Sequence, residues 1–157
     1  MKNNADLLAF LKENQVVGTI LEFRETVHSV AEASAAAGLP EENFIKTIIC
    51  IDEQTGKAFA FIVGGTDRLD LEKASQACGQ KVRMAKAKEA LEKTGYEVGG
   101  TPPVGTGIPV FVDEKVTEKN AVVGGGGSSR HLLKIAPYEI INAAGASVAE
   151  LTEKHRI

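Results

Sequence analysis

The spacing of apolar residues along the chain predicts five helices. In the first, Leu7 and Leu11 lie one turn apart on the same face, a pattern typical of a helix that packs against a core. In the second, Ser29 and Glu32 have the spacing of a capping box, in which each side chain accepts a hydrogen bond from the other's backbone N–H. Asp67 is expected to cap the third helix. The predicted helices span residues 4–14, 29–38, 67–79, 86–93 and 137–144.

Runs of β-branched and aromatic residues between these helices predict seven strands. Two of the runs are separated by five residues that include Gly56, which predicts a β-hairpin. The chain after residue 145 is expected to form a short strand or a tail. The predicted strands span residues 19–23, 44–52, 58–65, 81–85, 108–113, 121–124 and 131–135.

The order of these elements predicts the fold class. Helices and strands do not alternate regularly, and several strands are joined by short turns. This order favours an α+β fold with a mixed, curled, partly antiparallel β-sheet surrounded by helices. No repeat and no linker divides the chain, so residues 1–157 are expected to form a single domain.

Composition narrows the class of protein. The chain is 43% apolar and 25% charged, which is typical of a globular domain, and it has no run of 18 apolar residues and no basic-then-apolar leader. Two cysteines, Cys50 and Cys78, are too few for a disulfide framework or a zinc site. We therefore expect a cytoplasmic protein with no metal, no cofactor and no membrane contact.

The charge pattern bears on nucleic-acid binding. A net charge of -3, from 18 basic and 21 acidic residues, argues against a protein that grips nucleic acid over a long surface. Contact with one end of an RNA remains open. Residues 68–93 contain seven basic and four acidic residues, a local charge of +3. This segment is either a solvated helix face or a patch that steers RNA.

Lys46 is the most informative polar position because it interrupts an apolar strand. Side chains alternate across a strand, so Lys46 shares one face with Ile48 and Cys50. A strand that is apolar on both faces is usually interior, and burying an unpaired ammonium is costly. Two interpretations remain. Lys46 either extends its ammonium to water or points into a polar cleft, where it binds a phosphate or a carbonyl oxygen.

Two glycine-rich segments are suited to approach a substrate with their backbone amides. Residues 99–107 combine glycines with the prolines Pro102 and Pro103, which fix the shape of the loop. Residues 124–130 join two strands with four glycines, two serines and Arg130. Each segment is either a structural connection or a site for an anion or an oxyanion.

Familiar catalytic motifs are missing. The sequence has no GxxxxGK[ST] or GxGxxG phosphate loop, no HExxH and no GxSxG. His28, His131 and His155 show no metal-ligand spacing, and Cys50 is expected to be a buried, inert thiol. A small-nucleotide-binding protein is therefore disfavoured.

Four segments follow one another along the chain in a specific combination. They are the lysine strand, the loop from Gly99 to Pro103, the PVFVD run and the late VVGGGGSSRHLLKI segment. In this combination the sequence resembles the YbaK-like family of aminoacyl-tRNA deacylases, whose fold is also the editing domain inserted in bacterial prolyl-tRNA synthetases. The resemblance covers residues 29–140.

The resemblance implies hydrolysis of the ester between an amino acid and the 3′-terminal adenosine of a mischarged tRNA. The expected substrate is Cys- or Ala-tRNA(Pro), and prolyl-tRNA synthetase is a second expected partner. The residues expected to act in catalysis are Lys46, Gly99 and Gly100. Those expected to bind the substrate are His28, Thr47, Thr101, Pro102, Pro103, Gly125, Gly126, Ser128 and Arg130.

A family without a catalytic triad fits the chemistry, because an aminoacyl ester is already activated and needs mainly positioning and charge stabilisation. The alternative is a non-catalytic module of the same fold that binds a tRNA end or a synthetase.

Overall fold

The computed structural model describes residues 1–23 and 30–154, and this part of the chain forms two sheets and five α-helices. Ser29, expected to cap the second helix, and His28 lie outside the described residues. The α-helices are α1 (Asn4–Glu13), α2 (Val30–Ala37), α3 (Leu71–Cys78), α4 (Ala87–Thr94) and α5 (Pro137–Ala144), with short 3₁₀ turns η1 (Glu41–Asn43) and η2 (Val116–Glu118). None of these helices is long and apolar enough to span a membrane.

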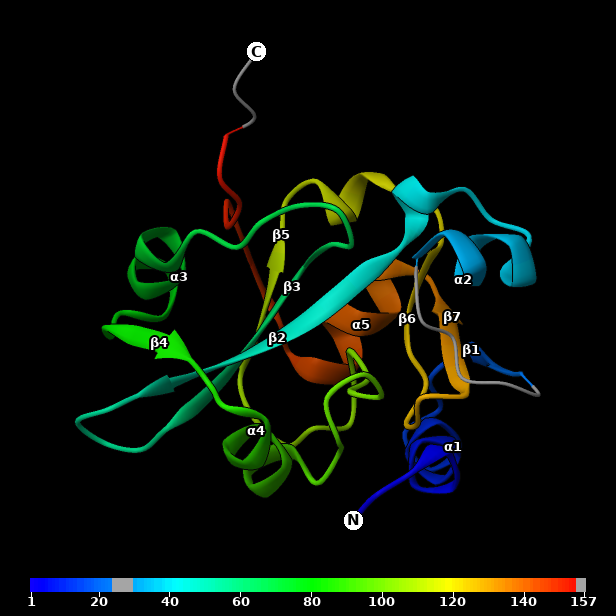
Figure 1. The fold of residues 1–157 in the computed structure, drawn as a ribbon, viewed down its shortest axis with the longest axis horizontal. Coiled ribbons are helices and arrows are strands. Elements are labelled where there is room, and N and C mark those ends of the chain that lie inside the picture. Colours follow the sequence, from blue (N-terminus) through cyan, green and yellow to red (C-terminus); the bar gives the residue numbers. More distant parts are fainter. Residues whose placement is uncertain (24–29, 155–157) are drawn as a thin grey trace.

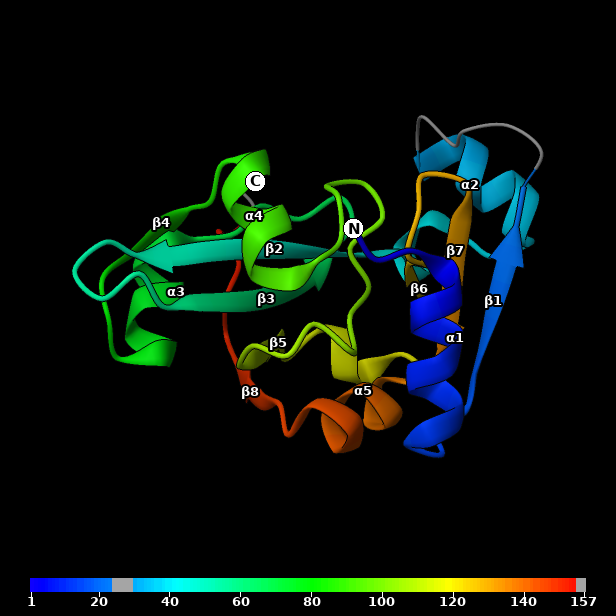
Figure 2. The same cartoon turned by 90° about the horizontal axis from the view of Figure 1, so that it is seen from below.

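The strands confirm the predicted mixed, partly antiparallel fold, and they are divided between two separate sheets. A five-stranded sheet has the order β4 (Val82–Met84), β2 (Ile45–Asp52), β3 (Ala58–Gly64), β5 (Val110–Asp113), β8 (Ser147–Ala149). A three-stranded antiparallel sheet has the order β1 (Gly18–Glu22), β7 (His131–Ile135), β6 (Val122–Gly125). The two sheets meet at a bridge between Phe44 and Val123. The smaller sheet stands at one end of the larger one, with α1 alongside it (Figures 1 and 2).

Apolar residues on both faces of β2 and β3 place these strands inside the molecule. Ile49 and Ile62 belong to a cluster that also contains Leu7 of α1 and Ile140 of α5. Cys50 and Phe61 face the other side, with Ala74 of α3 and Leu151 in the same cluster. Burial raises the pKa of Cys50 to about 12, so this thiol is inert, as the sequence indicated.

One helix start differs from its prediction. Asp70, not Asp67, caps α3, because its Oδ1 accepts hydrogen bonds from the N–H groups of Glu72 (2.9 Å) and Lys73 (3.1 Å). Asp67 lies in the turn after β3, where its carboxylate is 3.3 Å from Lys115 Nζ. Both aspartates precede an amphipathic run, so local spacing did not distinguish them.

The pairing of β2 leaves part of one edge open, and this opening positions the site. One edge of β2 pairs with β3 from Ile45 to Ile51, whereas the other edge pairs with β4 only from Cys50 to Asp52. Beyond β4, the next segment beside β2 is β6 of the second sheet, which meets Phe44. The Ala85 N–H also donates to the carbonyl of Ile49, so the edge from Ile45 to Ile48 faces a gap between the two sheets.

Arg83 of β4 links β4 to α4 and to the β2–β3 turn at one side of this gap. Its Nη1 and Nη2 lie 2.9 and 2.8 Å from the two carboxylate oxygens of Glu89 in α4, and its Nε lies 2.6 Å from Glu53 in the β2–β3 turn. The forked contact matches the planar guanidinium to the carboxylate. Hydrogen bonds from Arg83, and then from the Lys86 N–H, lower the pKa of Glu89 from 4.5 to about 2.

We expect Glu89→Gln to lower the melting temperature at pH 7 and to have a shrinking effect as the pH falls from about 4.5 towards 2. Because the pKa of Glu89 is lower in the folded state, its stabilisation is complete above the unfolded pKa and is lost as the folded pKa is approached. Thermal unfolding from pH 3 to 7 measures this difference. Glu92→Gln, an exposed change on the same helix, is the control. An equal destabilisation at pH 3 and pH 7 would contradict the ion-pair explanation.

Candidate active site

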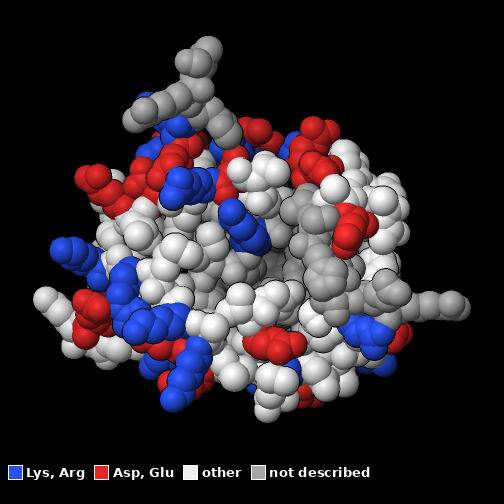
Figure 3. Space-filling model, in the orientation of Figure 1, with Lys and Arg blue, Asp and Glu red and all other residues white. Residues whose placement is uncertain are grey.

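A pocket of about 460 Å³ lies along the open edge of β2. Its floor is the segment 45–49, and its walls come from α2, the end of β4, α4, the loop at 98–101, β6 and β7. Figure 3 shows this face of the molecule, with a hollow near its centre. The size is within the range of small-molecule sites and exceeds what one small amino acid needs.

Lys46 lies in this pocket and is half-buried. Within residues 1–23 and 30–154, no hydrogen bond or ion pair joins its ammonium to a protein acceptor. Of the two interpretations of Lys46, the structure supports the one in which the side chain points into a cleft. A partly desolvated ammonium without a partner favours the binding of an anionic or carbonyl oxygen.

Thr47, the next residue, also lines the pocket. Its hydroxyl oxygen is buried and has no hydrogen-bond partner among the described residues. Buried hydroxyls are nearly always paired, so this oxygen is an unusual group in the pocket wall.

The loop at 98–101 contributes two backbone amides. Gly99 and Thr101 line the pocket, and neither N–H has an acceptor among the described residues. The N–H of Gly100, in contrast, already donates to the carbonyl of Glu97 at 3.1 Å. Of the two expected oxyanion donors, the Gly100 N–H is thus already engaged, whereas the Gly99 N–H is not.

Gly100 instead joins the two glycine-rich loops. Its carbonyl accepts a hydrogen bond of 2.8 Å from the N–H of Gly127, and a Cβ on Gly100 would lie only 2.8 Å from the backbone of Ser128. A Cβ on Gly125 would overlap the carbonyl of Thr101. The loops thus pack backbone against backbone, which explains the glycines by close approach.

Of the remaining expected site residues, some line the pocket and others lie outside its lining. Gly125 lines the pocket with Thr101. Pro102 and Pro103 are buried and do not line it, and Pro103 Cδ lies 3.5 Å from where a Cβ on Gly124 would be. Gly126 donates its N–H to the carbonyl of His131, and Arg130 is exposed outside the pocket.

Ser128 and His131 form a pair that the sequence did not reveal. Ser128 Oγ lies 2.5 Å from His131 Nδ1 and also accepts the N–H of Arg130 at 3.1 Å. His131 Nε2 lies 3.8 Å from a carboxylate oxygen of Glu22. His131 lines the pocket but Ser128 does not, so the pair holds the loop in shape and Ser128 is not placed as a nucleophile.

Sequence reasoning missed other parts of the pocket. Met84 and Val98 line it although these residues are 53% and 62% exposed, and Ser129 of the second glycine-rich loop lines it too. Exposure of large apolar residues at a pocket mouth was the only available signal, and it requires a structure. The described residues contain no group of three or more side chains that could hold a metal ion.

Comparison with known proteins identifies the family. Residues 24–143 match the model of the aminoacyl-tRNA editing domain. The chain is 30% identical over 131 residues to a candidate Cys-tRNA(Pro)/Cys-tRNA(Cys) deacylase, EbsC, of Enterococcus faecalis, covering 81% of this chain and 79% of that protein. It is 31% identical over 129 residues to the proline–tRNA ligase of Thermodesulfovibrio yellowstonii, of which it spans only 22%.

A solved structure agrees. The crystal structure of a protein described as a candidate trans-editing enzyme for prolyl-tRNA synthetase superposes with a TM-score of 0.88 at 31% identity, covering 96% of this chain and 97% of that one. The expected fold and the expected class of activity, an aminoacyl-tRNA hydrolase, are confirmed. This chain belongs to the aminoacyl-tRNA editing domain family.

Proposed function

We propose that this protein hydrolyses the ester bond of mischarged tRNA, with Cys-tRNA(Pro) as its main substrate. The observation that carries the proposal is one pocket lined by Lys46, Gly99 and Thr101, whose ammonium and backbone N–H groups have no partner among residues 1–23 and 30–154. The name of the Enterococcus faecalis relative supports cysteine as the amino acid. Because its substrate is tRNA, we place the activity in the cytoplasm.

In the proposed reaction, a water molecule attacks the ester carbonyl carbon and the bond to the ribose oxygen breaks. The water proton passes to the ribose oxygen, so the products are a free amino acid and an uncharged tRNA. The amides of Gly99 and Thr101 stabilise the oxyanion, and Lys46 anchors the phosphate or adenosine end. A hydroxyl of the tRNA orients the water, which removes the need for a protein nucleophile.

The volume of the pocket supports a nucleoside together with a small amino acid. About 460 Å³ is ample for a terminal adenosine carrying an aminoacyl group. The wall near the proposed oxyanion site includes Gly99, Thr101 and Gly125, whose small size leaves space for a short side chain. One methylene changes binding by only about 1–3 kcal/mol, so selection among small amino acids is expected to be graded.

A panel of Cys-, Ala-, Ser- and Pro-tRNA(Pro) tests this proposal. We expect kcat/KM to be highest for Cys-tRNA(Pro), lower for Ala-tRNA(Pro), and at least about tenfold lower for Pro-tRNA(Pro). Release of labelled amino acid over the spontaneous rate is the measurement, with and without prolyl-tRNA synthetase. Equal hydrolysis of all four would refute the small-residue pocket. Tight binding without any product would instead support the non-catalytic module.

A further inference from the structure

We propose that the corner formed by β4 and the first turn of α4 binds the phosphates of the RNA strand that enters the pocket. This inference rests on the proposed function, since it places the acceptor end of a tRNA beside the pocket. The residues assigned to the contact are Lys86 and Lys88, with Met84 and Val98 forming an apolar lip against the terminal bases.

The charge distribution singles out this corner. Residues 81–93 contain five basic and two acidic residues, a local charge of +3, so the other residues carry 13 basic and 19 acidic groups, or -6. Lysine and arginine side chains, with a few acidic ones among them, gather over the β4–α4 corner in Figure 3, to the lower left of the hollow. A polyanion that approaches an acidic protein is therefore attracted to this part of the surface.

Not every cation in the segment is available to RNA. Arg83 is held by Glu53 and Glu89, which neutralise it and fix it in the protein. Lys86 and Lys88 are exposed, and within the described part of the chain no ion pair engages their ammonium groups. Glu89 interacts electrostatically with Lys86, but the Glu89 carboxylate is held by Arg83.

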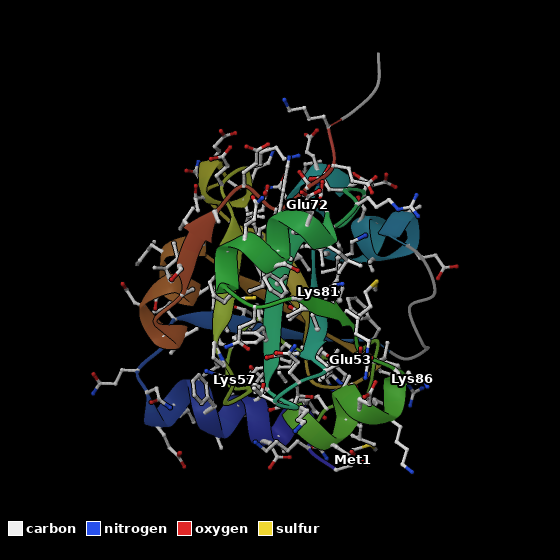
Figure 4. The ribbon with its side chains drawn as sticks, turned by 90° about the vertical axis from the view of Figure 1, so that its left-hand side faces the viewer. Met1, Glu53, Lys57, Glu72, Lys81 and Lys86 are labelled. Atoms are coloured by element: carbon white, nitrogen blue, oxygen red, sulfur yellow. The ribbon has the colours of Figure 1, made fainter. Side chains whose placement is uncertain are left out.

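The position of Lys86 links the corner to the pocket. Ala85 and Ala90 line the pocket, so Lys86, the N-cap residue of α4, directly follows one wall residue and lies about one helical turn before the other. In Figure 4, Lys86 lies near the right-hand edge, which is the side that faces the viewer in Figure 3, whereas Lys57 lies left of the centre. Lys88 belongs to the same first turn of α4.

The apolar lip suits the other component of an RNA end. Met84 and Val98 remain 53% and 62% exposed although both line the pocket. Exposed apolar groups at a pocket mouth bind the flat, weakly polar faces of unpaired bases, while neighbouring lysines bind the phosphates between them. The combination fits a single-stranded 3′ end more closely than it fits an acidic protein.

The test compares two substrates of the double variant Lys86→Ala/Lys88→Ala. For Cys-tRNA(Pro) at low salt, we expect kcat/KM to fall about tenfold, and the slope of log kcat/KM against log salt to flatten by about 1.4, or 0.7 per phosphate contact. For the cysteinyl ester of adenosine 5′-monophosphate, which lacks the upstream phosphates, kcat/KM should stay within about twofold of the wild type.

The control removes the same charge elsewhere, with Lys12→Ala/Lys57→Ala on α1 and the β2–β3 turn, and it should retain the wild-type salt slope. Three results would each overturn the proposal. They are an unchanged salt slope in the Lys86/Lys88 variant, an equal loss of kcat/KM on the cysteinyl ester of adenosine 5′-monophosphate, and an effect seen only when prolyl-tRNA synthetase is present. If the wild type hydrolyses neither substrate, the proposed function fails. The affinity of an uncharged acceptor-stem hairpin RNA and its salt dependence then decide the RNA contact separately.

Discussion

Replacing Lys46 with alanine is expected to lower kcat/KM for Cys-tRNA(Pro) by about 100-fold, because without this anchor the ester is misplaced relative to the attacking water and the oxyanion donors. The melting temperature should change little, because the ammonium has no protein partner among the described residues. Single-turnover release of labelled cysteine, followed with circular dichroism of the same preparation, measures both quantities.

Two further variants separate the charge of Lys46 from its bulk. Lys46→Met keeps the length of the side chain without the ammonium and should be as impaired as the alanine variant. Lys57→Ala removes an exposed lysine from the neighbouring hairpin and should be fully active. A folded Lys46→Ala protein with near-normal turnover would remove this residue from the mechanism.

The second large effect is expected at Gly125, where alanine should lower kcat/KM by at least about 100-fold and destabilise the protein by about 1–3 kcal/mol. A Cβ here would lie 2.8 Å from the carbonyl carbon of Thr101 and 3.0 Å from that of Gly100, and these backbone atoms cannot rotate away. The loop would have to move, and with it the Gly99 and Thr101 amides.

Gly65→Ala is the matched control for this prediction. The nearest atoms to a Cβ at Gly65 belong to Phe44 at 3.4 Å, which is an ordinary contact, so we expect small changes in melting temperature and turnover. Chemical denaturation and single-turnover hydrolysis are measured on both variants. If Gly125→Ala were as stable and as active as Gly65→Ala, the close packing of the two loops would not support the site.

Elements that depend on neighbouring residues were predictable from the sequence. The apolar face of α1, the Gly56 hairpin between β2 and β3, and Pro137 at the first position of α5 all appear within one or two residues of expectation. Each of these signals is local, because helix and strand periods and turn chemistry act over a few residues. Lys46 was also detectable, since a charge in an apolar strand breaks a local pattern.

Contacts between distant segments were not predictable in the same way. The hydrogen bond from the Gly127 N–H to the Gly100 carbonyl, the bridge between Phe44 and Val123, and the ion pair of Asp67 with Lys115 depend on which groups the fold brings together. Sequence spacing gave each of these residues several equivalent partners.

The sequence by itself determined the elements, the family and the choice of Lys46 and the Gly99–Pro103 loop as residues to test. Tertiary structure alone decided that the chain forms two sheets, that β4 leaves the edge of β2 open, and that this gap becomes the pocket. The physical reason is range: periodicity and capping are encoded within a turn or two of chain. A cavity, by contrast, is the space that remains when distant parts of the chain pack around it without filling it. Here those parts contribute Ala33, Lys46, Gly99 and His131.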